Sequence, residues 1–163
     1  RITSVARSEG VAVPQGFLTG NVPLQIPANT TCTILFDQKY LTLGYPEMLV
    51  SGGKSAIVKI NYAENLYDDK KEKAHRDKIE GMHIKGINDV YVLDGGKERL
   101  YRPLWYRSFR FIQLSIRTGN EPLTIHKYHN VHSLAPLPLK ATFKSNNPLY
   151  DRIWDICWRT ASI

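Results

Sequence analysis

Residues Arg107–Arg117 read RSFRFIQLSIR, and this stretch decides the fold of the chain. Its side chains alternate with a period of two, which is typical of a β-strand whose two faces meet different surroundings. The alternation places Phe109 and Phe111 on one face and Ile112 and Leu114 on the other. We therefore expect a long strand here, with both phenylalanines in the protein core.

Other strand candidates lie on both sides of this stretch and are separated by turn signals such as SGG at 51–53 and DGG at 94–96. These candidates are residues 22–26, 31–37, 45–50, 55–62, 89–93, 123–131 and 139–143. Short strands joined by turns predict an all-β fold, an antiparallel β-sandwich of the jelly-roll type.

The C-terminal segment has a different pattern. Asn147 followed by Pro148 is typical of a helix N-terminus, and Leu149, Ile153 and Ile156 follow at helical spacing. Tryptophans at 154 and 158 add a second apolar stripe. The helix has too much apolar surface to stand alone in water, so we expect it to pack on another part of a longer parent protein.

The ends of the sequence favour the same interpretation. The chain begins at Arg1 rather than Met and stops at Ile163 inside the helical pattern, as expected of a piece of a longer protein. We expect three parts: an irregular lead-in or edge strand over 1–21, a β-sandwich domain over 22–145, and the start of a helical linker over 146–163. The two cysteines, Cys32 and Cys157, fit no zinc pattern and are expected to be small buried residues.

Composition excludes several classes of protein. The 163 residues are 42% hydrophobic and 23% charged, unlike a disordered tail, a collagen-like chain or a coiled coil. No stretch approaches the ~18 apolar residues of a membrane-spanning helix. The net charge of +7 allows anionic partners, but acids and bases alternate over residues 68–80 and no run of five basic residues occurs. Nucleic acid is therefore not an expected partner.

Two regions could carry binding chemistry. Glu64 follows an apolar strand, where it could bind a sugar hydroxyl or calcium, or pair with Arg76 or a lysine at the rim. In residues 102–111, aromatic residues interleave with arginines, so Trp105 and Arg107 could form a platform on which a sugar ring or a nucleobase stacks. The alternative is that Arg107 and Arg110 only bridge strands. The candidate sugar-binding residues are Glu64, Arg76, Trp105 and Arg107.

No residue is proposed as catalytic or as a metal ligand, and no cofactor is expected. His126, His129 and His132 recur at every third position, but alternation along a strand puts His129 on the opposite face from the other two. Zinc needs converging ligands. We interpret these residues as ordinary surface histidines.

An ordered set of motifs resembles the bacterial α-L-rhamnosidases of glycoside hydrolase family 78. The motifs are INYAE (60–64) with LY (66–67), RD (76–77), DVY (89–91), RPLWYRSFRF (102–111), Phe143, NPL (147–149), IW (153–154) and WRT (158–160). The resemblance extends over about residues 22–163. It implies a β-sandwich that lies immediately before an (α/α)6 barrel, with residues 149–163 leading into the first barrel helix.

In that family the catalytic acid and base are barrel carboxylates, and no position of this chain matches them. The resemblance therefore implies a non-catalytic, structural domain of an enzyme that hydrolyses terminal α-L-rhamnosyl bonds. Its expected partners are the rest of the parent enzyme and possible carbohydrate, and the family favours a periplasmic or extracellular location. The alternative is a carbohydrate-binding module with its own site around Trp105 and Arg107.

Overall fold

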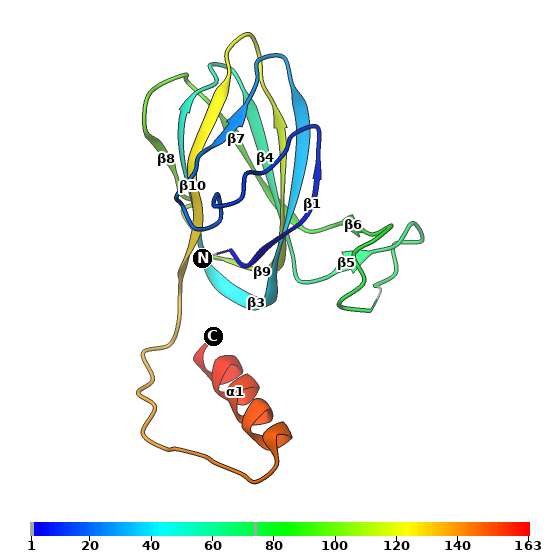
Figure 1. The fold of residues 1–163 in the computed structure, drawn as a ribbon, viewed down its shortest axis with the longest axis vertical. Coiled ribbons are helices and arrows are strands. Elements are labelled where there is room, and N and C mark those ends of the chain that lie inside the picture. The colour runs from blue at the N-terminus through cyan, green and yellow to red at the C-terminus, as the bar shows by residue number, and fades with distance from the viewer. Residues whose placement is uncertain (1, 74) are drawn as a thin grey trace.

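The computed structural model describes residues 2–73 and 75–163, so residue 1 of the expected lead-in lies outside the description. The described residues form a mostly antiparallel β-structure followed by one helix (Figure 1). The elements are β1 (Ser4–Glu9), β2 (Leu24–Ile26), β3 (Thr31–Gly52), β4 (Ile57–Ala63), β5 (Leu66–Tyr67), β6 (His83–Ile84), β7 (Ile87–Val92), β8 (Arg99–Tyr101), β9 (Arg107–Arg117), β10 (Leu123–His132) and α1 (Pro148–Ser162).

Strand β3 belongs to both layers of the sandwich. Its first half pairs with β1 and β9, and its second half pairs with β10 and β8. The register on β9 shifts between Asp37 and Thr42, where the chain turns from one layer to the other. Figure 1 shows β3 running along one side, curving at the end of the sandwich and returning on the other side. The candidates 31–37 and 45–50 are thus two halves of one bent strand.

The main core lies between these layers. Strand β9 contributes Ile112, Leu114 and Ile116, which pair with alternate residues of β3 and β4 so that their side chains share one face. Phe36 on the first half of β3 meets Tyr128 on β10 with ring centroids 5.5 Å apart, so this contact joins the two layers. The prediction of an antiparallel β-sandwich with a C-terminal helix is confirmed.

Phe109 and Phe111 are both fully buried, as predicted, but they lie in different clusters. Phe109 is in the main core, 5.8 Å from the Tyr62 ring, whereas Phe111 packs with Leu35, Leu66 and Met82 in a smaller cluster. The prediction that they share one face is wrong. The cause is the turn in β3: Phe111 pairs with position 37 and Phe109 with position 42, so four residues of β3 face a single residue of β9.

One further expectation needs correction. Residues 139–143 form no strand, because the segment 133–146 leaves the sandwich and runs out to α1 (Figure 1). A strand there would have no neighbour to satisfy its backbone groups. Residues 64–86, which contain the stretch of alternating charge and are called the insertion below, form the hairpin of β5 and β6, and Leu66 of this hairpin belongs to the smaller cluster.

Helix α1 begins as the sequence predicts. The Asn147 side chain accepts a hydrogen bond from the Leu149 amide at 3.0 Å, and Pro148 opens the helix. None of its residues is buried, so Cys157 is exposed and the expectation of burial is wrong for that cysteine, while Cys32 is buried. No helix of the described residues is long and apolar enough to cross a membrane.

Candidate functional site

A cavity of about 440 Å³ lies where β4 ends and β9 begins, and we call it the Trp105 cavity. It contains three of the four candidate residues: Glu64, Trp105 and Arg107. The fourth, Arg76, lines an adjacent cavity of about 640 Å³ that extends to Arg159 of α1, the Arg159 cavity. Glu64 lines both cavities, so the four residues lie along one connected depression.

Glu64 follows directly after β4 and reaches across to β9. Its Oε1 accepts a hydrogen bond from the Ser108 hydroxyl at 3.0 Å. The expected ion pair with Arg76 is not formed, and within the described residues Glu64 makes no ion pair. Arg76 instead lies 3.8 Å from Asp77 and donates to the backbone oxygen of Lys39 at 3.4 Å. One Glu64 oxygen therefore remains available to a ligand hydroxyl.

Arg107 is held by protein groups. Its Nη2 and Nε donate to the two oxygens of Asp89 at 2.6 and 3.1 Å, and its Nη1 donates to the backbone oxygens of Trp105 and Tyr106 at 2.8 and 3.3 Å. The Tyr101 hydroxyl also donates to Asp89, at 2.9 Å. Arg107 thus holds the backbone of Trp105 and Tyr106 in place, and its guanidinium is occupied by these contacts within the protein.

The charge state of Asp89 follows from these contacts. Burial by itself raises the pKa of this carboxyl, but the hydrogen bonds from Arg107 and Tyr101 outweigh burial and hold the pKa below its usual value. The hydrogen bond to Asp89 in turn raises the pKa of Arg107. Both groups stay charged at neutral pH, so the pair is a fixed support for the cavity wall.

The aromatic pair itself is exposed. Trp105 is 65% exposed and Tyr106 37% exposed, with ring centroids 5.2 Å apart and an interplanar angle of 32°. The Tyr45 ring contacts the Tyr106 ring edge-on, with the ring centroids 6.5 Å apart. A tryptophan ring held in place yet open to solvent offers a flat apolar surface to a ligand.

Arg110 has the strand-bridging role that the alternative interpretation gave it. Its guanidinium donates to both oxygens of the buried Asp37 at 2.9 and 3.1 Å, to Asp77 at 2.8 Å and to the backbone oxygen of Arg76 at 2.7 Å. These bonds tie the insertion 64–86 to the turn of β3. The sequence could not reveal this cluster, because Arg110 and Asp37 are 73 positions apart.

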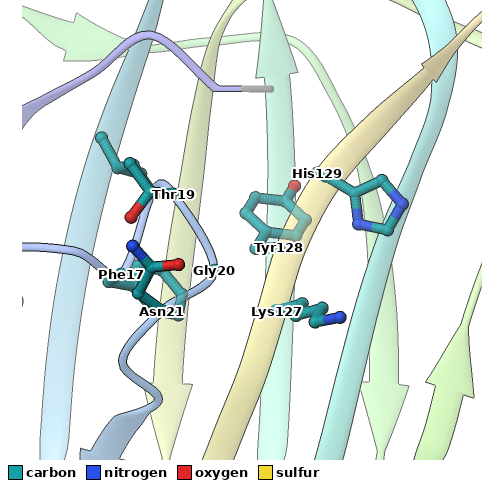
Figure 2. A pocket seen from close by; sticks show the side chains of 8 residues that line it. Phe17, Thr19, Gly20, Asn21, Lys127, Tyr128 and His129 are labelled. Carbon is teal, nitrogen blue, oxygen red and sulfur yellow. The ribbon is translucent and has the colours of Figure 1, made fainter.

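A third cavity, of about 430 Å³, lies beside β10 and the loop 14–21 (Figure 2). In Figure 2, Thr19 and Asn21 come from the loop, whereas Lys127, Tyr128 and His129 come from β10. His129 turns to Glu47, with Nε2 and Oε2 3.0 Å apart, and His126 contacts the Ser51 hydroxyl. No three His, Cys, Asp or Glu side chains of the described chain come together as a cation site.

These features define an antiparallel β-sandwich domain with a solvent-open aromatic cavity at one end. The family model described as the bacterial α-L-rhamnosidase concanavalin-like domain matches residues 29–134. The chain belongs to this family, and the resemblance seen in the sequence motifs is confirmed.

Solved structures support the same fold. A glycoside hydrolase family 78 rhamnosidase of Bacillus sp. GL1 superposes with a TM-score of 0.70 at 18% identity, over 91% of this chain and 15% of the Bacillus chain. A rhamnosidase of Klebsiella oxytoca with rhamnose bound gives a TM-score of 0.50 at 12% identity, over 81% of this chain and 28% of that chain. The chain therefore spans well under a third of either relative. No curated protein matches it.

Proposed function

We propose that this chain is a non-catalytic β-sandwich domain of an α-L-rhamnosidase and that it packs against the helical catalytic barrel of its parent through α1. The parent would remove terminal α-L-rhamnosyl residues with inversion, using two carboxyl groups of the barrel, one as acid and one as base. In this proposal the three parts are the lead-in 1–21 with its edge strand β1, the sandwich domain 22–145, whose last residues from 133 on connect it to α1, and the linker 146–163.

The observation that carries the proposal is the uncovered apolar surface of α1. Leu149, Ile153 and Ile156 form one stripe and are 45–57% exposed. A second stripe contains Trp154 and Trp158, and Trp154 stacks on Phe143 at 5.5 Å. Toward the sandwich, Arg159 lies 4.5 Å from the Tyr40 ring centroid, and the Ser162 backbone oxygen accepts a hydrogen bond from the Ala135 amide of the connecting segment. Exposed apolar surface of this extent marks a contact with another domain.

Size-exclusion chromatography over a range of concentrations tests this proposal. We expect the chain to self-associate through α1 when no barrel covers the helix, and a chain ending after Asn147 to remain monomeric. The double variant Ile153→Lys, Ile156→Lys should also be monomeric. Asp155→Lys, on the polar side of the helix, is the control and should self-associate like the unsubstituted chain. A full chain that stays monomeric, with Trp154 and Trp158 shielded from a fluorescence quencher, would contradict the proposal.

A second candidate function is carbohydrate binding by the domain itself, with Glu64, Arg76, Trp105 and Arg107 around the ligand. The exposed ring of Trp105 favours it, because the ring lines the same cavity as Glu64, which has one oxygen free for a ligand. Titration with L-rhamnose, followed by Trp fluorescence, separates this candidate from a purely structural role. Saturable binding that Trp105→Ala abolishes would support it, and no binding would leave the structural role.

A further inference from the structure

The Trp105 and Arg159 cavities form one groove. They share Glu64, Asn65 and Lys73 in their walls. With volumes of about 440 and 640 Å³, each has the size of an ordinary small-molecule site. The groove is therefore long enough for a ligand of more than one ring.

Two lysines stand beside the aromatic end of this groove. Lys73 forms a backbone bridge to Tyr67, and the Lys85 ammonium lies 5.8 Å from the centroid of the same Tyr67 ring. Both lysines are exposed, and within the described residues neither ammonium is in an ion pair. Lys73, Lys85 and Tyr67 all line the Trp105 cavity, so two lysines without an acidic partner border the same space.

The other charges along the groove are largely matched. Arg107 forms an ion pair with Asp89, and Arg110 forms ion pairs with Asp37 and Asp77. Lys39 also forms an ion pair with Asp37. Arg159 adds a further cation at the α1 end, where it lies over Tyr40. Among the described residues that line the two cavities, Glu64 is the one acid, and it already accepts a hydrogen bond from Ser108. The groove therefore has an excess of positive charge close to Trp105.

We propose that this groove binds an anionic saccharide, with a sugar ring on Trp105 and the acidic group of the sugar between Lys73 and Lys85. A lysine ammonium is a compact positive charge that can donate hydrogen bonds to either a carboxylate or a sulfate ester. The free oxygen of Glu64 accepts a hydrogen bond from a hydroxyl of the sugar ring and thereby orients the sugar. This inference rests on the second candidate function, sugar binding at the same site, and adds the charge of the ligand to it.

Isothermal titration calorimetry of the full chain tests this inference with four probes. They are trigalacturonate, the same trimer with its carboxyls reduced, a sulfated carrageenan tetrasaccharide, and an oligothymidylate of matched charge. We expect at least one acidic saccharide to bind about tenfold or more tightly than the reduced trimer, as a charged hydrogen bond is lost on reduction. The carboxylated and sulfated probes distinguish the two sources of the negative charge.

Variants locate the binding. Lys85→Ala and Lys73→Ala should each weaken acidic-saccharide binding about tenfold and leave that of the reduced trimer unchanged. Trp105→Ala should weaken both. Lys97→Ala removes an exposed lysine outside the groove and should change nothing; circular dichroism confirms that each variant is folded.

Three failures are distinguishable. If neither trigalacturonate nor the sulfated tetrasaccharide bound more tightly than the reduced trimer, the inference would be overturned and sugar binding would remain intact, whereas no binding of any saccharide would overturn both. An oligothymidylate that binds as tightly as the acidic saccharides would show a general anion site and would also overturn the inference.

Discussion

Arg110 and Asp37 show how one residue pair holds the turn of β3. Arg110 is 5% exposed and Asp37 is fully buried, and their double hydrogen bond joins β9 to the end of the first half of β3. A buried charge without its partner is strongly unfavourable. Arg110→Ala should therefore lower the free energy of unfolding by about 3–5 kcal/mol in urea denaturation. The double variant Arg110→Met, Asp37→Leu should recover much of that loss, and a double variant no better than Arg110→Ala would contradict this explanation.

The same pair predicts a pH dependence. Burial raises the pKa of Asp37, but hydrogen bonds from Arg110 and Lys39 outweigh burial and leave the pKa below its usual value. A carboxyl with a lowered pKa in the folded state stabilises the protein above its unfolded pKa of about 4, and that stabilisation is lost as the pH falls through the lower folded value. Unfolding measured from pH 7 down to 2 should show this decline. Asp37→Asn should flatten the decline, and an unchanged decline in that variant would contradict this explanation.

Phe109 and Phe111 separate two consequences of losing a buried ring. Each Phe→Ala should cost about 3–5 kcal/mol, because a cavity adds to the lost burial. Phe111 packs on Leu66 and Met82 of the insertion, so Phe111→Ala should also release the insertion to limited proteolysis under native conditions. Phe109→Ala should leave proteolysis of the insertion unchanged. Equal cleavage in the two variants would show that the insertion does not depend on the smaller cluster.

At the scale of elements, local patterns predicted β4, β7, β9, β10 and α1, because each has its own periodicity or cap. They did not predict that residues 31–52 form one strand, since the turn at 38–41 is defined by pairing with β9 and β10. The candidate site divides in the same way. Glu64, Trp105 and Arg107 flank strand ends that meet in the sandwich, whereas Arg76 was placed by the Arg110 cluster, which no local pattern reveals.

The N-terminus of α1 offers a test at this scale. The Asn147 side chain caps the Leu149 amide, and the helix has no buried residue to compensate for loss of the cap. Asn147→Ala should cost the helix about 1 kcal/mol and reduce its signal in far-UV circular dichroism. The neighbouring Asn146→Ala is the matched control and should leave the signal unchanged. An identical loss in both variants would mean that the cap does not stabilise the helix.

At the scale of the whole molecule, the carboxyl groups bear on the proposal that this chain is a non-catalytic domain. An inverting glycosidase needs two carboxyl groups about 6.5–9.5 Å apart, one of them with a raised pKa so that it can donate a proton. In the described residues the Trp105 cavity has Glu64 as its one carboxylate lining residue. Nearby Asp89 is held by Arg107, and its lowered pKa makes it a poor proton donor.

The purified chain should therefore release no aryl alcohol from an aryl α-L-rhamnoside between pH 4 and 9, beyond the rate in buffer. Glu64→Gln and the unsubstituted chain should be equally inactive, because the described lining of the Trp105 cavity has no second carboxylate to complete an acid and base pair. Binding is a separate property, so a chain that takes up a saccharide in the groove should still leave the glycosidic bond intact. Turnover by the unsubstituted chain that disappears in Glu64→Gln would place a catalytic carboxylate in the sandwich. That result would overturn the proposal that the barrel alone supplies the catalytic groups.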